Sequence, residues 1–246
     1  KINLNTLSDQ HLLGVWEFGL QHSVFETNLY LLSLIFPEKD DATIWAMPVG
    51  ERDAKLLRFR EIRFGSTFQN KAQCPSCGES LEWESMTTDF ILYPPDQTLA
   101  QSVWNLKHQE VNYEFRLPNN QDVFEALAYH NSELHEAYVI QQCVQIRNQK
   151  SGTFHLSEEV QKRILDKMEE VDPQSNISMH LSCPECQHTW EVAFDIMEYL
   201  WIEINEWAIQ CMRDIYQLAK TFHWPESEIL AMNPFRRNLY LKMINA

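Results

Sequence analysis

Apolar residues recur at helical spacing in the first part of the chain. Between residues 8 and 36 they predict two helices that are separated near residues 21–23. A third helix is expected over residues 51–64, where charged and apolar side chains alternate until Gly65 ends the pattern. Residues 1–66 are therefore predicted to form a segment of N-terminal helices.

Short β-prone runs replace the helical pattern at two places that are far apart in the sequence. At each place two such runs flank a pair of cysteines: residues 67–72 with 81–88, and residues 177–181 with 190–194. Each pair of runs predicts a β-hairpin that turns at its cysteines. We assign residues 67–92 and 176–194 to these two hairpins.

The remaining segments are predicted to be mainly helical. Residues 93–175 hold a strand at 111–117 and helices near 121–129, 132–146 and 157–171. Residues 195–246 are expected to begin with the longest helix, to about Thr221, followed by a short helix after Pro225. Asn233 and Pro234 then supply an N-cap and a first helical residue for the last helix.

Composition and charge limit the classes of protein that this chain can be. A length of 246 residues with 44% hydrophobic residues allows one or two packed domains. The formal net charge of −15 argues against sequence-independent binding to nucleic acid or to an anionic membrane. No apolar run approaches the roughly 18 residues of a membrane span, and the first residues do not resemble a secretory signal. We therefore expect a protein that is neither secreted nor embedded in a membrane.

Charge is unevenly distributed along the chain. Residues 74–182 carry 7 basic and 17 acidic side chains. The predicted helix of residues 51–63 instead has five basic residues among three acidic ones. A solvated helical surface is the simpler interpretation of each segment, and a docking surface is the alternative. Under that alternative, the side chains that we expect to contact a partner are Arg58, Arg63, Glu158, Glu159, Glu169 and Glu170.

The six cysteines are too few for a disulfide scaffold in a chain of this length, and four of them form two CPxC pairs. The segments Cys74-Pro75-Ser76-Cys77 and Cys183-Pro184-Glu185-Cys186 align without gaps, together with the five residues that follow each. In a zinc knuckle, the tight turn after the first cysteine directs both thiolates to one point, so two knuckles supply the four ligands of a tetrahedral Zn²⁺ site. The sequence therefore predicts one structural zinc ion per chain, bound by Cys74, Cys77, Cys183 and Cys186.

The predicted fold is α+β and mainly helical, with a four-cysteine zinc ribbon made of two CPxC knuckles. The 105 residues between Cys77 and Cys183 exceed the usual spacing of ribbon halves, so residues 93–175 are interpreted as an acidic α+β insertion. Two alternatives stay open for the cysteine pairs, namely reduced surface cysteines or one disulfide in each pair. A thioredoxin-like redox pair is disfavoured because neither copy begins a helix.

Other candidate residues have simpler interpretations. His188 could replace a zinc ligand, but a role beside a ligand or on the surface is favoured. Cys143 and Cys211 lie on apolar helical stripes and are interpreted as core thiols. Gly78 suits the position of a knuckle that has a left-handed backbone conformation. At the equivalent position, Gln187 would adopt a positive φ at a conformational cost of about 1 kcal/mol. Four thiolates leave zinc no open position for catalysis, and the sequence has no phosphate loop, nucleophile elbow or HExxH motif, so we expect no enzyme.

Segments along nearly the whole chain share their pattern with one known family. Besides both knuckles, they are residues 14–19 (GVWEFG), 47–54 (MPVGERDA), 58–61 (RFRE), 64–65 (FG), 115–118 (FRLP), 195–201 and 219–241. Together they resemble the T-even-type phage baseplate hub assembly chaperone family, which also occurs in phage-tail-like contractile injection systems. The resemblance implies a non-enzymatic factor that helps to assemble the baseplate hub in the bacterial or phage-infected host cytoplasm, through contacts with baseplate or hub proteins.

Two other classes stay open. A permanent structural component of the baseplate would stay in the finished particle, whereas an assembly factor would leave it. A zinc ribbon that binds nucleic acid is disfavoured by the net charge of −15. We therefore expect protein partners, with no nucleic acid and no membrane.

Overall fold

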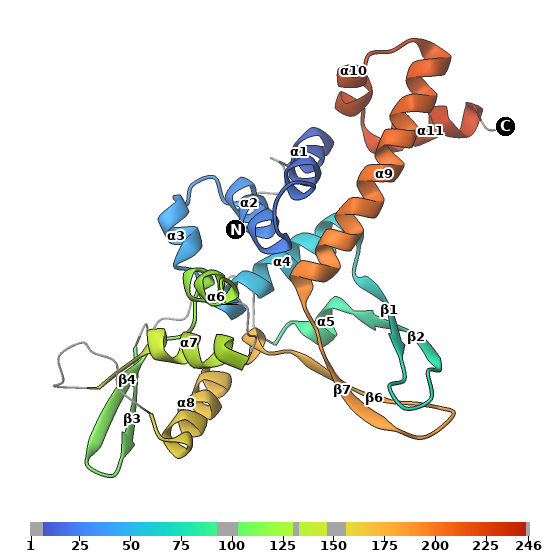
Figure 1. Cartoon of the computed structure of the whole chain (residues 1–246). Helices are drawn as coiled ribbons and strands as arrows, with labels where there is room; N and C mark the ends of the chain where they lie inside the picture. Colours follow the sequence, from blue (N-terminus) through green and yellow to red (C-terminus); the bar gives the residue numbers. More distant parts are fainter. Residues whose placement is uncertain (1–6, 93–102, 130–132, 147–155, 245–246) are drawn as a thin grey trace. The chain divides into compact units, whose positions relative to one another are not determined.

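The computed structural model describes residues 7–92, 103–129, 133–146 and 156–244, and the chain is α+β and mainly helical, as predicted (Figure 1). It divides into two compact units. The first unit joins residues 1–38 to residues 197–246, and the second unit is formed by residues 39–196. The finer division into four parts (N-terminal helices, two-part zinc ribbon, insertion and C-terminal helices) stays a prediction. Among the described residues, no helix combines the length and the apolar composition that crossing a lipid bilayer requires.

The first unit is helical and confirms the helices expected at both ends of the chain. Its elements are α1 (Asp9–Gly19), α2 (Val24–Ile35), most of α9 (Ile196–Phe222), α10 (Glu226–Ala231) and α11 (Pro234–Ile244). The break between α1 and α2 is set by Ser23, whose Oγ accepts a hydrogen bond from the backbone N–H of Glu26 at 3.2 Å. Asn233 likewise accepts from the N–H of Phe235 at 2.9 Å and caps α11, which begins with Pro234.

Apolar packing and two polar contacts join the N-terminal helices to the C-terminal helices within the first unit. The buried cluster consists of Leu13, Ala208, Cys211, Ile215, Leu218, Ile229 and Leu241. Arg237 donates from Nη2 to Asp9 Oδ2 at 2.6 Å, and both side chains are buried. Trp16 donates from Nε1 to Asn205 Oδ1 at 3.0 Å. Residues that are more than 180 positions apart therefore form one core, and Cys211 belongs to it as expected.

The second unit combines short helices with three small antiparallel sheets. Its helices are α3 (Asp41–Trp45), α4 (Val49–Phe64), α5 (Thr87–Phe90), α6 (Asn120–Leu127), α7 (Glu133–Cys143) and α8 (Glu158–Val171), with a 3₁₀ turn at Pro173–Ser175. The sheets are β1 (Thr67–Gln73) with β2 (Ser80–Met86), β6 (Ser178–Ser182) with β7 (Thr189–Ala193), and β3 (Trp104–His108), β4 (Val111–Phe115) and β5 (Val144–Ile146) in that order. Both predicted hairpins are therefore confirmed.

The structure differs from the predicted elements in three places. Residues 144–146 were expected at the end of a helix, but they form β5 because Val144 pairs with Phe115 of β4. The strand β3 and the short helix α3 were not predicted. Residues 87 and 88 begin α5 instead of ending β2, since the Asp89 carboxylate accepts from the N–H of Met86 at 2.7 Å. The predicted residues 93–102, 132 and 147–155 lie outside the described part of the chain.

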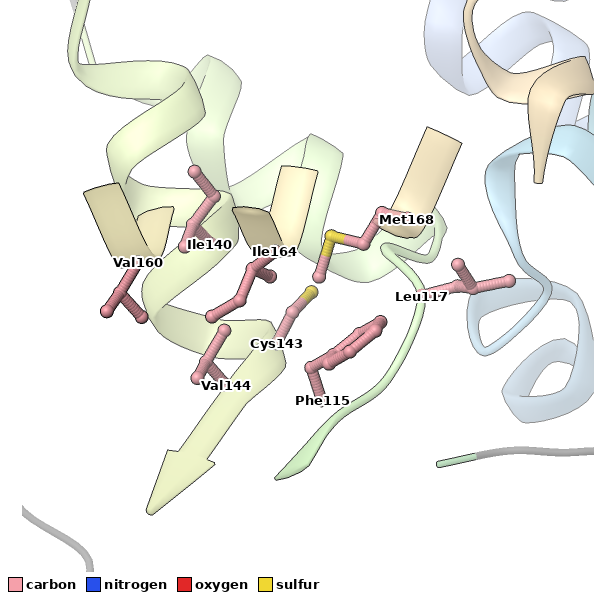
Figure 2. Close-up of a cluster of buried hydrophobic side chains, with 8 residues drawn as sticks. All are labelled: Phe115, Leu117, Ile140, Cys143, Val144, Val160, Ile164 and Met168. Atoms are coloured by element: carbon pink, nitrogen blue, oxygen red, sulfur yellow. The ribbon is translucent and has the colours of Figure 1, made fainter. Parts of the chain in front are cut away.

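The insertion has its own hydrophobic core, which Figure 2 shows. It is formed by Phe115, Leu117, Ile140, Cys143, Val144, Val160, Ile164 and Met168. The thiol of Cys143 lies among Phe115, Ile164 and Met168, and the residue is 2% exposed. Burial raises the pKa of this thiol to about 12, and the nearby Arg116 guanidinium opposes the shift. Cys143 is therefore a core thiol, as its apolar stripe predicted.

Candidate metal centre

Each CPxC pair lies in a six-residue loop that closes a β-hairpin. In the first knuckle, residues 74–79, the loop follows the Gln73–Ser80 pair of strands β1 and β2. In the second knuckle, residues 183–188, it follows the Ser182–Thr189 pair of β6 and β7. Both loops are therefore held at their base by an equivalent pair of strand residues. The two hairpins lie side by side (Figure 1).

The two knuckles share the same pair of backbone hydrogen bonds. In the first knuckle, Cys74 donates its N–H to the Glu79 carbonyl at 2.8 Å, and Gly78 donates to the Cys74 carbonyl at 2.9 Å. In the second knuckle, Cys183 donates to the His188 carbonyl at 2.9 Å, and Gln187 donates to the Cys183 carbonyl at 3.0 Å. The sequence copies thus fold into copies of one turn.

The fifth residue of each loop has a left-handed backbone conformation. The φ angle is 78° at Gly78 and 59° at Gln187. Glycine adopts this conformation without a Cβ clash, whereas an L side chain is strained there by roughly 1 kcal/mol or more. The strain predicted for Gln187 is therefore present in the second knuckle.

The four cysteine sulfurs converge although the pairs are far apart in the sequence. All four Sγ atoms lie within 4.8 Å of one another. Between the knuckles, Cys74 Sγ lies 3.6 Å from Cys186 Sγ, and Cys77 Sγ lies 3.6 Å from Cys183 Sγ. Sulfurs placed about 2.3 Å from a central zinc ion in a tetrahedron would lie about 3.8 Å apart. The cluster therefore has the dimensions of a tetrahedral metal site.

The sulfur positions decide between the interpretations that the sequence left open. A disulfide requires an S–S distance of about 2.05 Å, and all four cysteines are free. In each knuckle the first cysteine is buried and the second is exposed, so the cluster is partly accessible to solvent. Two unrelated surface pairs would not bring four sulfurs together in this way. The arrangement instead fits a metal ion held between the hairpins.

In the first knuckle, the surrounding groups favour the thiolate of Cys74 and disfavour that of Cys77. Burial disfavours charge at Cys74, but N–H groups of Cys77 and Ser76 and the thiols of Cys186 and Cys77 donate to its sulfur and lower its pKa to about 6. At Cys77 the N–H of Glu79 favours the thiolate, yet hydrogen bonds with Cys186 and burial outweigh it and raise the pKa to about 12. Four thiolates within 4.8 Å of one another would repel, so a bound cation is needed to hold all four ionised.

His188 lies outside the cluster of possible ligands, and this agrees with the favoured interpretation. Its side chain is exposed, and its ring lies over Trp190 with centroids 6.0 Å apart and planes 15° apart. Its backbone carbonyl accepts the hydrogen bond from Cys183 that closes the second knuckle. His188 therefore contributes to the turn through its main chain.

An aromatic cluster that the sequence analysis did not identify joins the bases of the hairpins. Phe90 of α5 stacks on Phe194, which follows β7, with centroids 4.0 Å apart. Phe68 of β1 meets both rings edge-on, at 4.9 Å from Phe90 and 5.6 Å from Phe194. Phe68 is fully buried. The apolar residues that flank the CPxC hairpins were visible in the sequence, but their meeting depends on the long-range fold.

The helix α4 is not the solvated basic surface that its sequence suggested. Arg52, Lys55 and Arg60 are all buried. Arg60 donates to the carbonyls of Gly65 and Thr67, at 2.7 Å each, and its guanidinium lies 3.7 Å above the Phe68 ring. Lys55 pairs with Glu51 at 3.2 Å.

The structural role of these cations explains the error. Arg60 donates hydrogen bonds to backbone carbonyls just after α4 and at the start of β1, so it holds the first hairpin in position against α4. Arg58 remains exposed and pairs with Glu61, while Arg63 is half-buried. On α8, Glu158, Glu159, Glu169 and Glu170 are exposed, as a docking surface requires.

These features define a mainly helical α+β protein with a candidate metal centre built from four cysteines. A family model described as T4 bacteriophage base plate protein matches residues 6–201, which include both knuckles. Because this match covers more than half of the chain, the chain belongs to the T4 bacteriophage base plate protein family. No curated protein and no solved structure matches the chain. The family resemblance predicted from the sequence is confirmed at this level.

Proposed function

We propose that this protein is a non-enzymatic assembly factor for the baseplate hub of a contractile phage tail or phage-tail-like injection system, with a fold held by one Zn²⁺ ion. The proposed zinc ion is supported by the convergence of four cysteine Sγ atoms within 4.8 Å of one another. The proposed role in the baseplate is supported by membership of the T4 bacteriophage base plate protein family. Protein contacts, and not a reaction, are the activity that this proposal assigns.

The donor set supports zinc in a structural role. Thiolates are soft ligands that suit zinc, and four of them in a tetrahedron leave no position for a substrate or for a reactive water. The ion would close a loop of 105 residues between Cys77 and Cys183, and closing so long a loop has an entropic cost that metal–thiolate bonds offset. Zinc would thereby hold the two hairpins and the insertion in one unit.

Four exposed glutamates on α8 support one candidate docking surface, and the exposed Arg58 with the half-buried Arg63 on α4 form a second. Changing Glu158, Glu159, Glu169 and Glu170 to Gln removes the acidic surface, and changing Arg58 and Arg63 to Glu reverses the basic one. Co-purification from the intact gene cluster would measure whether each variant still captures its baseplate or hub partner. A matched control changes the exposed Glu226 and Glu228 of α10 to Gln.

We expect at least one of the two surface variants to capture less partner than the control. Full capture by both would exclude electrostatic docking at these surfaces. If the unaltered chain captures no baseplate or hub protein from the intact gene cluster, the assembly role itself is wrong.

A second candidate function is that of a permanent baseplate component. The description of the family as a base plate protein favours it. Protein composition of purified particles separates the two candidates, since a permanent component is present at a fixed ratio to other baseplate proteins and a departing assembly factor is absent. Under both candidates the protein meets its partners in the host cytoplasm, where particles assemble.

The nucleic-acid alternative has little physical support. A net charge of −15 opposes contact with phosphates, and binding through phosphates would weaken steeply with salt. A gel-shift titration over several salt concentrations tests it. We expect no shift at physiological salt.

A further inference from the structure

The long helix α9 has an exposed edge on which apolar and charged residues alternate. Its apolar residues, Ile202, Ile209 and Tyr216, are 55%, 40% and 64% exposed. They recur every seven residues, and this spacing keeps them on one face of a helix for about 21 Å. Residues of this size with so much surface in water are candidates for contact with another protein.

The core of the first unit does not account for these residues. The buried stripe of α9 lies on another face and consists of Leu200, Ile204, Ala208, Cys211, Ile215 and Leu218. Each helical face therefore has its own apolar pattern. The exposed edge also begins at Ile202, just after the last residue that the family model matches. The match to the family model therefore does not explain why these apolar residues are exposed.

The charged residues of the exposed edge reverse sign along the helix. Glu206 lies between Ile202 and Ile209, and Arg213 lies between Ile209 and Tyr216. All five side chains are exposed, and so is Lys220 one turn further on. The edge is thus acidic in its first half and basic in its second half. A helix with this pattern is complementary to a copy of itself that runs in the opposite direction.

We propose that α9 pairs with α9 of a second copy of this chain in an antiparallel arrangement around a twofold axis beside Ile209. In this register Ile209 meets its own counterpart, and Ile202 lies opposite the second copy's Tyr216. Glu206 then lies opposite the second copy's Arg213, and the symmetry repeats the pair on the other side of the axis. A parallel arrangement would instead place Glu206 against Glu206 and Arg213 against Arg213.

The size of the contact sets the expected affinity. One helix pair of about 21 Å buries an area at or below the lower end of specific interfaces, about 1,200 Å² in total. Interfaces of about 1,600 Å² range from micromolar to picomolar affinity, so for this smaller contact we expect a reversible dimer with a dissociation constant on the order of 10 μM. The contact does not involve the cysteine cluster, so it is independent of the proposed zinc site.

Sedimentation velocity of the full chain over a range of concentrations tests this arrangement. Ile209→Glu places a charge at the axis, and we expect it to leave a monomer. The matched control is Ile62→Glu on α4, because Ile62 is 45% exposed and does not belong to the α9 edge. We expect the control to dimerise as the unaltered chain does. Circular dichroism establishes that each variant keeps its helices.

Charge reversal tests the register. Glu206→Arg alone and Arg213→Glu alone each place like charges opposite each other, and we expect each to weaken the dimer about tenfold or more. The double variant restores complementarity, so its dimer should recover. A chain that stays monomeric up to about 300 μM, well above the expected range, would overturn the proposal. So would a dimer that Ile209→Glu leaves intact, or a double variant that remains as weak as the single ones.

Discussion

The two knuckles form the same turn, although they have different residues at the position with a left-handed backbone conformation. Gly78 has a φ of 78°, and Gln187 has a φ of 59° at the equivalent place. Both loops keep the same two backbone hydrogen bonds and the same pairing at their base. The paired strands and the two backbone hydrogen bonds therefore define the turn, and glycine only lowers the strain of the left-handed residue.

The largest effect should come from losing one ligand in either knuckle. Cys77 and Cys186 are both exposed, so replacing either sulfur with a hydroxyl leaves no buried cavity. We expect Cys77→Ser and Cys186→Ser to reduce bound zinc equally and to lower the free energy of unfolding by about 3 kcal/mol or more, equivalent to roughly 10 °C in Tm. Elemental analysis and thermal melts measure both effects.

The matched controls for ligand loss are the two core cysteines. Cys143→Ser and Cys211→Ser should keep the full zinc content, although Cys211→Ser loses stability because a hydroxyl is buried in an apolar cluster. The site also links distant segments, so loss of Cys186 should expose the insertion to protease. If only one knuckle variant lost zinc, the equivalence of the knuckles would be wrong.

A smaller effect should separate the core thiol of Cys143 from the knuckle thiols at alkaline pH. Burial raises the Cys143 pKa from 9.0 to about 12. Between these values the unfolded chain loses this proton and the folded chain keeps it, so stability decreases as the pH rises. At pH 11, two units above 9.0, the loss is about 2.7 kcal/mol for this thiol, since each pH unit is worth about 1.36 kcal/mol.

Cys143→Ser removes that contribution. Urea unfolding should show a shallower decline between pH 9 and pH 11 for the variant than for the unaltered chain, and equal slopes between pH 6 and pH 8, where the thiol is protonated in both states. Identical slopes in the alkaline range would show that the thiol ionises as easily in the folded protein as in the unfolded one.

The smallest effects should come from exchanging residues at the left-handed position. No atom lies within 4 Å of a Cβ built at Gly78, so the cost of Gly78→Ala is the backbone conformation alone, about 1 kcal/mol. Gln187→Gly should stabilise the protein by about 0.5–1 kcal/mol. Denaturant unfolding with excess zinc measures both, and changes of the same sign would contradict the strain that we assign to Gln187.

The sequence was sufficient where the determining interactions are local. Both knuckles were predicted because the turn, the cysteine spacing and the flanking strands all lie within one short segment, Thr67–Met86 or Ser178–Ala193, and the second copy repeated the signal. Helices α1, α2, α8 and α9 were predicted for the same reason, since apolar periodicity and capping residues define them.

The sequence was insufficient where a residue's role depends on how one element packs against another. Arg60 has the pattern of a surface cation, and only the folding of β1 beside α4 supplies the carbonyls and the Phe68 ring that bury it. Val144 belongs to a helical pattern, but pairing with Phe115 makes it a strand residue. In both cases the packing of neighbouring elements decides the outcome, and for Val144 the pairing with a strand overrides its local helical propensity.

The metal content of the native protein tests the central claim most directly. Protein purified without chelator is analysed for metals, and the metal-to-chain ratio is compared with the folded fraction measured by circular dichroism. We predict one zinc ion per chain, because Cys74, Cys77, Cys183 and Cys186 form one tetrahedral set of ligands. A ratio near zero in a well-folded sample would contradict the account, because the two hairpins would then hold together without the ion.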